Sequence, residues 1–307
     1  MNFAFSEEQE ELRNIVRSFL ENKSPEAAVR EQMETENGFD EAVWTQMAEQ
    51  MGLQSLIIPE EYGGSGYSYV ELTVVLEEMG RALLCAPYFS TVVLATNTIL
   101  PAGDDAAKTD AGTSLFHLNS DAAGLTREAL STMDQTRKQA KLTFADTPAT
   151  LIGTDGGGWD VLSTVLDLTA VALAAEQVGG AQLVLEMAVQ YAKDRVQFGR
   201  PIGSFQAIKH KCADMLLEVE SAKSAAYYAA WCAAEMNDEL PSVASLAKAY
   251  CSEAYFHASA ENIQIHGGIG FTWEHPAHLY FKRAKSSELL FGDPTYHREL
   301  LAQRIGI

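Results

Sequence analysis

Basic residues are scarce in this chain: 22 lysines and arginines stand against 42 acidic residues, giving a formal net charge of -20 over 307 residues. A surface this acidic disfavours nucleic acid and anionic membranes, so we expect neither as a partner. Cysteine is scarce as well. Its four copies, Cys85, Cys212, Cys232 and Cys251, stand singly, without the spacing of a metal site or a redox motif. We expect buried thiols and no bound metal.

No run of about twenty apolar residues occurs, although 47% of the chain is hydrophobic. We therefore expect a soluble protein without a membrane span. The first residues, Met1 to Glu8, have no basic start and no apolar signal core, which favours a cytoplasmic location. The length is enough for two or three compact units.

Helical periodicity is evident from the N-terminus. Ser6 followed by Gln9 forms a capping-box pattern, and the residues after it carry an apolar stripe at helical spacing. Further helical patterns cover residues 43–51, 69–84 and roughly 91–100. We predict an N-terminal helical domain over residues 1–100.

The predicted fold class is α+β, mostly α. Residues 101–113 are typical of a polar loop, and three short β-like runs follow at 114–118, 140–144 and 149–152. We predict a reduced β middle region over residues 101–158, with room for only a small sheet. Four long amphipathic helical patterns then predict a C-terminal four-helix bundle over residues 159–307, with faces suited to oligomerisation.

The few cations of the chain concentrate at one corner between two predicted helices. Five of the 22 fall within nineteen residues around a Gly/Pro turn: Lys193, Arg195, Arg200, Lys209 and Lys211. A local cationic patch on an anionic protein favours a small anion such as a diphosphate. The same spacing also fits a solvated corner with cations near a helix C-terminus. Spacing alone does not decide between the two.

Two motifs in this part of the chain resemble the acyl-CoA dehydrogenase family. The first runs from Arg195 to Gln206 and reads Arg-Val-Gln-Phe-Gly-Arg-Pro-Ile-Gly-Ser-Phe-Gln. The second begins at Gln264 and reads Gln-Ile-His-Gly-Gly-Ile-Gly-Phe. Near the N-terminus, Ile58-Pro-Glu-Glu-Tyr-Gly-Gly-Ser-Gly is similar to the first domain of that family. The resemblance covers nearly the whole chain.

The resemblance implies FAD as cofactor and an acyl-CoA thioester as substrate. In such enzymes a carboxylate removes the α-proton while the β-hydride passes to the flavin. By position, the resemblance assigns the diphosphate and adenosine end of FAD, held across a subunit interface, to Arg195, Phe198, Gln206, Gln264, Gly267 and Gly268. The residue types suit this role, because a guanidinium matches phosphate oxygens bidentately and paired glycines let backbone N–H groups approach a ligand.

The chain departs from the family pattern in two respects. The Thr-Glu-Pro-like loop and Thr-Asn-Gly-like strand that wrap the flavin ring in complete members are missing. The catalytic carboxylate is missing too. Counting from the second motif puts Phe291 at the usual base position and Thr169 at the alternative one, and neither is a usable base. Glu288 and Asp293 stand nearby in sequence but are displaced from the expected position.

These departures are explained most economically by a site shared between unlike subunits. This chain would supply the diphosphate and adenosine side of FAD, and a full-length homologue would supply the flavin pocket and the catalytic glutamate in an α2β2 heterotetramer. Heteromeric family members of bacterial sterol degradation suggest a bulky ring-bearing CoA thioester, and the family implies electron-transfer flavoprotein as acceptor. Two alternatives stay open: a self-sufficient homo-oligomeric dehydrogenase with a relocated base, and a non-catalytic CoA- or nucleotide-binding regulatory protein.

Overall fold

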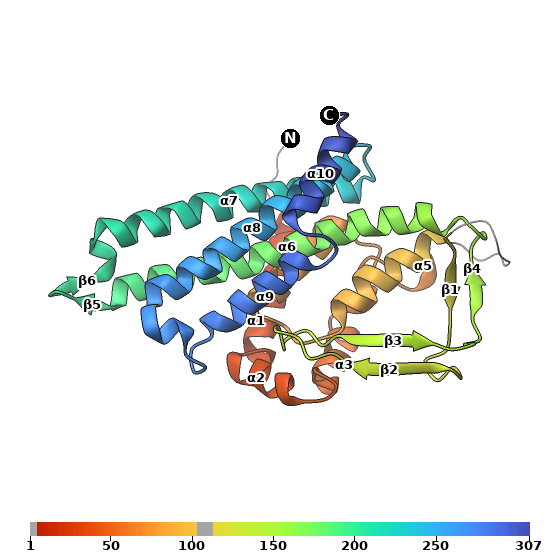
Figure 1. Cartoon of the computed structure of the whole chain (residues 1–307), viewed down its shortest axis with the longest axis horizontal. Helices are drawn as coiled ribbons and strands as arrows, with labels where there is room; N and C mark the ends of the chain where they lie inside the picture. Colours follow the sequence, from red (N-terminus) through yellow and green to blue (C-terminus); the bar gives the residue numbers. More distant parts are fainter. Residues whose placement is uncertain (1–4, 103–112) are drawn as a thin grey trace.

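The computed structural model of the protein describes residues 5–102 and 113–307 (Figure 1). The α-helices are α1 Glu7–Lys23, α2 Glu26–Glu34, α3 Glu41–Glu49, α4 Tyr69–Arg81, α5 Thr96–Ala102, α6 Gly158–Asp194, α7 Gln206–Ala234, α8 Leu240–His266, α9 Ala277–Leu289 and α10 Pro294–Arg304. The strands are β1 Leu115–His117, β2 Leu125–Ala129, β3 Ala140–Phe144, β4 Thr150–Ile152, β5 Val196–Gln197 and β6 Arg200–Pro201. Short 3-10 segments cover Leu53–Ser55, Glu60–Tyr62, Ile202–Ser204 and Gly267–Phe271, and a π-helix covers Phe89–Ala95. The predicted mostly helical class is confirmed.

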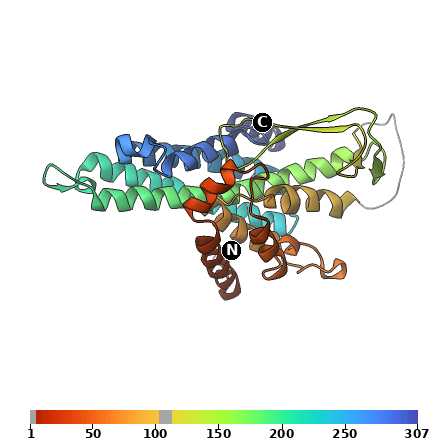
Figure 2. The ribbon, with the colours of Figure 1, turned by 90° about the horizontal axis from the view of Figure 1, so that it is seen from below.

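Helix α6 lies at the centre of the molecule and packs against α4, α7, α8 and α9 (Figures 1 and 2). Its residues 167–181 are buried on every side. Among the described helices it alone is long and apolar enough to cross a membrane, yet 72% of its apolar window is buried inside the protein. That burial is typical of the core helix of a bundle.

Two glycines let the backbones of α4 and α6 touch. A Cβ atom at Gly80 would lie 2.0 Å from the carbonyl oxygen of Glu176, and one at Gly179 would lie 1.9 Å from that of Glu77. No side chain fits into either space, so the N-terminal helices are packed against the bundle at backbone contact distance.

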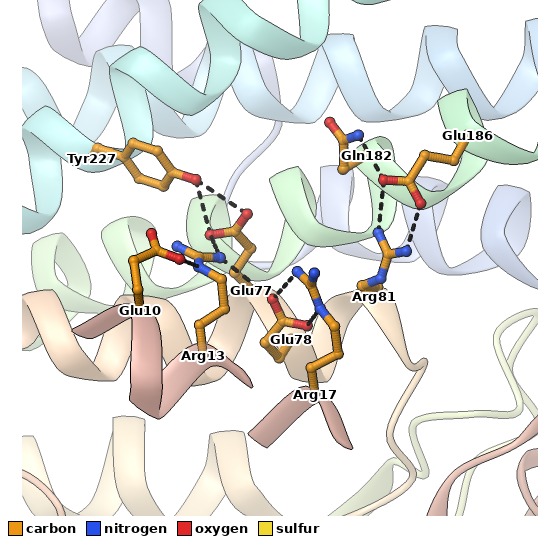
Figure 3. Close-up of polar contacts among 9 residues, drawn as sticks. All are labelled: Glu10, Arg13, Arg17, Glu77, Glu78, Arg81, Gln182, Glu186 and Tyr227. Carbon is orange, nitrogen blue, oxygen red and sulfur yellow. Dashed lines mark hydrogen bonds and ion pairs between the residues drawn. The ribbon is translucent and has the colours of Figure 1, made fainter. Parts of the chain in front are cut away.

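Ion pairs fix α1 on this surface (Figure 3). The guanidinium of Arg13 donates to Glu77 at 2.7 Å, and that of Arg17 forms a two-pronged contact with Glu78, with Nε 2.8 Å from Oε2. Tyr227 of α7 donates to the Glu77 carboxylate at 3.0 Å. Both carboxylates are buried, so they require these partners. The network joins α1, α4 and α7.

The middle of the chain forms ribbons and no larger sheet within the described residues. β1 pairs with β4, β2 with β3, and β5 with β6, all antiparallel. The three predicted β-like runs are confirmed. Strand β2 was missed, because Leu-Thr-Arg-Glu-Ala alternates only weakly between apolar and polar residues. Most of the predicted 101–113 loop, residues 103–112, lies outside the described part of the chain.

The turn between β2 and β3 is anchored to the helical bundle. Arg283 of α9 is only 2% exposed and donates from Nε to Asp134 at 2.8 Å, from Nη2 to Thr136 at 2.6 Å and from Nη1 to Glu176 at 3.1 Å. Arg137 pairs with the other oxygen of Glu176. The network brings together a turn, α6 and α9, with two cations balancing two carboxylates.

Three of the four thiols are buried as predicted, those of Cys85, Cys232 and Cys251. The prediction is wrong for Cys212 of α7, which is only half-buried and packs against the edge of the core. Burial raises the pKa of the Cys251 thiol to about 12. These are inert thiols of helix packing, and no cluster of possible metal ligands occurs in the described residues.

Candidate functional site

The first motif forms a hairpin at one end of the bundle (Figure 1). Arg195 caps α6, and the chain then turns through the β5–β6 ribbon before α7 begins at Gln206. Phe198 and Gly199 occupy the tip with φ angles of +52° and +78°. The Phe198 ring is 91% exposed. An aromatic ring held in solvent by a left-handed backbone is suited to contacting a flat ligand or another subunit.

The second motif ends α8. Gly267 follows the helix with a φ angle of +66°, which favours glycine. A Cβ atom added at Gly267 or Gly268 would meet nothing within 4 Å. The backbone is therefore open to an approaching ligand, and Gln264 is exposed one turn earlier.

The structure brings the two motifs to the same end of the bundle. Tyr191, in the last turn of α6, stacks on His266, in the last turn of α8, with ring centroids 4.2 Å apart. Lys211 of α7 pairs with Glu261 of α8 nearby. His266 is buried and its Nδ1 lies 2.8 Å from the carbonyl oxygen of Asn262, so it serves packing.

The donors at this end fit part of FAD. The side chains of Arg195, Gln206 and Gln264 are exposed and have no hydrogen-bond or ion-pair partner within the described residues. A guanidinium, two primary amides and an open glycine backbone match the oxygens of a diphosphate, and an exposed aromatic ring matches adenosine. Within one chain these residues form an exposed surface.

Neither predicted base position holds a usable proton acceptor. The Phe291 ring stacks on Phe89 with centroids 6.2 Å apart and its backbone has a φ angle of +59°. Thr169 is fully buried within α6, and its hydroxyl donates to the carbonyl oxygen of Val165 at 2.6 Å. Both side chains serve packing.

The two displaced carboxylates are engaged in local structure. Glu288 accepts from Lys285 at 3.0 Å, three residues away on α9. Asp293 caps α10 by accepting from the backbone N–H of Tyr296 at 2.7 Å. A relocated base would have to leave these partners, so the structure gives no support to either as a base.

A buried lysine that the sequence did not reveal holds the loop around Phe291. Lys248 of α8 is fully buried, and its Nζ donates to the carbonyl oxygens of Glu288 and Gly292 and to Ser252, each at 3.0 Å. Burial lowers the pKa of Lys248 to about 8. Its carbonyl partners are forty or more residues away in sequence, and no local pattern marks them.

We expect this lysine to produce a rise in stability on the alkaline side. An unfolded lysine has a pKa of about 10.4, so between about pH 8 and 10 the unfolded chain binds more protons than the folded one, and the unfolding free energy rises with pH. The unfolding free energies of the native chain and of Lys248→Met are measured in urea at each pH. We expect the difference between them to rise with a slope that approaches about 1.4 kcal/mol per pH unit. Buried thiols and phenols titrate equally in both proteins, so their contribution cancels in this difference. An exposed control, Lys193→Met, should leave the pH profile unchanged, and a flat difference for Lys248→Met contradicts the prediction.

The chain is similar to known proteins over most of its length. Residues 6–115 match the family model described as Acyl-CoA dehydrogenase, N-terminal domain, and residues 156–306 match the one described as Acyl-CoA dehydrogenase, C-terminal domain. Acyl-CoA dehydrogenase IpdE2 of Mycobacterium tuberculosis is 39% identical over 321 residues, covering 96% of this chain and 95% of the relative. IpdE2 of Mycolicibacterium smegmatis is 38% identical over 313 residues, covering 94% and 96%. These relatives are of similar length to this chain.

Solved structures show the same fold. A variant of the Tcur3481-Tcur3483 steroid ACAD superposes with a TM-score of 0.86 at 27% identity, covering 97% of this chain and 98% of that one. The ChsE4-ChsE5 complex from Mycobacterium tuberculosis superposes with a TM-score of 0.90 at 24% identity, covering 99% of both chains.

Proposed function

Because the chain belongs to the acyl-CoA dehydrogenase family, we propose that it is one subunit of a heteromeric, FAD-dependent acyl-CoA dehydrogenase. The enzyme forms a double bond between the α and β carbons of a CoA thioester. This chain contributes the surface for the diphosphate and adenosine of FAD, and a full-length homologue contributes the flavin pocket and the catalytic glutamate. The proposal rests on one observation: a free, exposed set of phosphate donors coexists with a packed phenylalanine at the base position.

The relatives support the finer parts of the proposal. The two solved structures are named as pairs of proteins, and one is described as a complex, which supports an α2β2 assembly of unlike subunits. One is named a steroid dehydrogenase, which supports a bulky ring-bearing acyl group. Electron-transfer flavoprotein as acceptor and a cytoplasmic location complete the proposal.

The role of this chain's residues is to bind FAD and to orient it. Arg195 donates charge-assisted hydrogen bonds to the diphosphate, and the Gln206 and Gln264 amides donate beside it. Gly267 and Gly268 let the phosphates approach the backbone closely. FAD held by these residues would supply the acceptor for the β-hydride. The α-proton goes to the glutamate of the homologue, because no group of this chain at the base positions accepts it.

The test of this half-site is retention of FAD by the assembled complex. Arg195→Ala removes a charge-assisted contact worth roughly 1.5–3 kcal/mol, so FAD affinity should fall about ten- to a hundredfold with the fold intact. Lys23→Ala removes the same charge from an exposed end of α1 and serves as the control. Flavin content is measured by absorbance after serial dilution and dialysis. Equal retention in both variants removes Arg195 from the site.

A further inference from the structure

A cavity of about 290 Å³ opens away from the cofactor end, beside Phe291. It lies between the α2–α3 loop at Gly38, the residues around Phe89 where the π-helix begins, the end of α9, and the β2–β3 turn at Arg137 and Lys138. Four segments far apart in sequence enclose it, and the anchored turn forms one wall. The volume is close to the lower end of small-molecule pockets, which begin at about 300 Å³.

Part of the lining of this cavity is aromatic. Phe39, Phe89 and Phe291 all line it. The rings of Phe89 and Phe291 are nearly parallel, with an interplanar angle of 25°. Because these two rings stack on each other, they form one apolar surface, which favours a flat or short apolar group lying against it.

The charged lining residues are cations alone, in a chain with 42 acidic residues. They are Arg137 and Lys138. Glu41 reaches only the outer rim, where its carboxylate accepts from Asn37 at 3.3 Å. The charges of Arg137 and Arg283 are balanced by two buried carboxylates, so Lys138 supplies the uncompensated positive charge.

Lys138 is held in place at the cavity. Its Nζ donates to the carbonyl oxygen of Met33 at 2.6 Å, and an ammonium has three N–H donors, so two remain for a ligand; no other partner occurs in the described residues. Its stem lies on Gly38, where a Cβ atom would stand 2.3 Å from Cγ of the lysine. Only glycine leaves room for the stem, and the φ angle of +73° also favours glycine.

Arg137 lies at the inner end of the cavity. Its guanidinium pairs with Glu176 and lies 5.2 Å over the Phe89 ring. Its Nη1 is buried without a hydrogen-bond partner in the part of the chain that the structure describes. Glu176 thus engages the Arg137 charge, and Lys138 is the cation of the cavity that has no carboxylate partner among the described residues.

We propose that this cavity binds a small organic anion: a monocarboxylate with a flat or short apolar body. The carboxylate accepts from Lys138, and the body lies against Phe89 and Phe291. Because Phe291 accepts no proton, the ligand is bound without reaction. This site is distinct from the FAD surface and does not depend on the proposed dehydrogenase activity.

The test measures the binding of benzoate and of benzyl alcohol, which has a similar ring and no charge, to the full chain. Binding is followed by ligand-detected saturation-transfer NMR. Benzoate should bind at least about tenfold more tightly, because a hydrogen bond to a charged group contributes roughly 1.5–3 kcal/mol. Lys138→Met should weaken benzoate about ten- to a hundredfold and leave benzyl alcohol unchanged.

A second variant tests whether the ligands bind in this cavity. Ser90 lies on the rim and donates to a backbone carbonyl, so Ser90→Phe should fill the mouth and remove both ligands. Ser224→Phe, at an equally exposed helical serine with the same kind of backbone bond on α7, is the matched control and should change neither. Equal binding of acid and alcohol, or benzoate binding that survives both Lys138→Met and Ser90→Phe, overturns the proposal.

Discussion

Dehydrogenase activity should appear only when this chain is combined with a full-length homologue. Phe291 and Thr169 stand at the positions where we predict the base, and both side chains are packed, so we expect no acceptor for the α-proton in this chain. A general base typically contributes about 10²–10⁴-fold to the rate, and its loss is easily measured. Acyl-CoA oxidation and flavin content are measured for each chain alone and for the pair. We expect one productive flavin per pair of unlike chains.

Mutations separate this expectation from a relocated base. Replacing the catalytic glutamate of the homologue should abolish turnover. Glu288→Gln and Asp293→Asn in this chain should change turnover only slightly, because their partners are Lys285 and the start of α10. Robust activity of this chain alone that is lost in Glu288→Gln contradicts the shared site and favours a self-sufficient enzyme.

Much of the fold could be predicted from the sequence, because helices leave local signals. The capping box at Ser6 is present, with the Ser6 side chain accepting from the backbone of Gln9. The pattern over residues 69–84 matches α4, which ends three residues earlier at Arg81. The pattern over 91–100 turned out to be a π-helix followed by α5, a change of hydrogen bonding that periodicity does not report.

The residues of the candidate site were recognisable, but their surroundings were not. The two motifs give, by type and order, the residues that we propose face FAD, and the stack of Tyr191 on His266 gives their shared location. Apart from Ser252, the hydrogen-bond partners of Lys248 lie 40 or more residues away in sequence. Those of Arg283 lie 107 or more residues away. Long-range polar contacts follow from packing, and a single sequence has no periodic signal for them. The anion cavity escaped prediction for the same reason.

Breaking the buried network at Arg283 should have the largest effect on stability. Arg283→Met leaves Asp134 and Glu176 buried with Arg137 as their nearest remaining cation, and breaking a buried ion pair typically costs about 3–5 kcal/mol. Urea unfolding of the variant and the native chain at pH 7 measures the loss. Arg298→Met breaks an exposed pair and should cost no more than about 1 kcal/mol.

The pH dependence of the stability lost in Arg283→Met distinguishes the effect of the Arg283 charge from that of its packing. Burial raises the pKa of Asp134, but the Arg283 guanidinium, the hydrogen bonds from Thr136 and the Arg137 charge together outweigh burial and hold the pKa below its ordinary value. The pKa of Glu176 is lowered against burial by Arg137 and Arg283 together. The native chain therefore loses stability as pH falls through these carboxyls, whereas in Arg283→Met they take up protons at higher pH. The difference in unfolding free energy between the native chain and Arg283→Met should thus become smaller as the pH falls from 7 to 5. A difference that stays constant over this range would show that Arg283 acts through its packing volume and not through its charge.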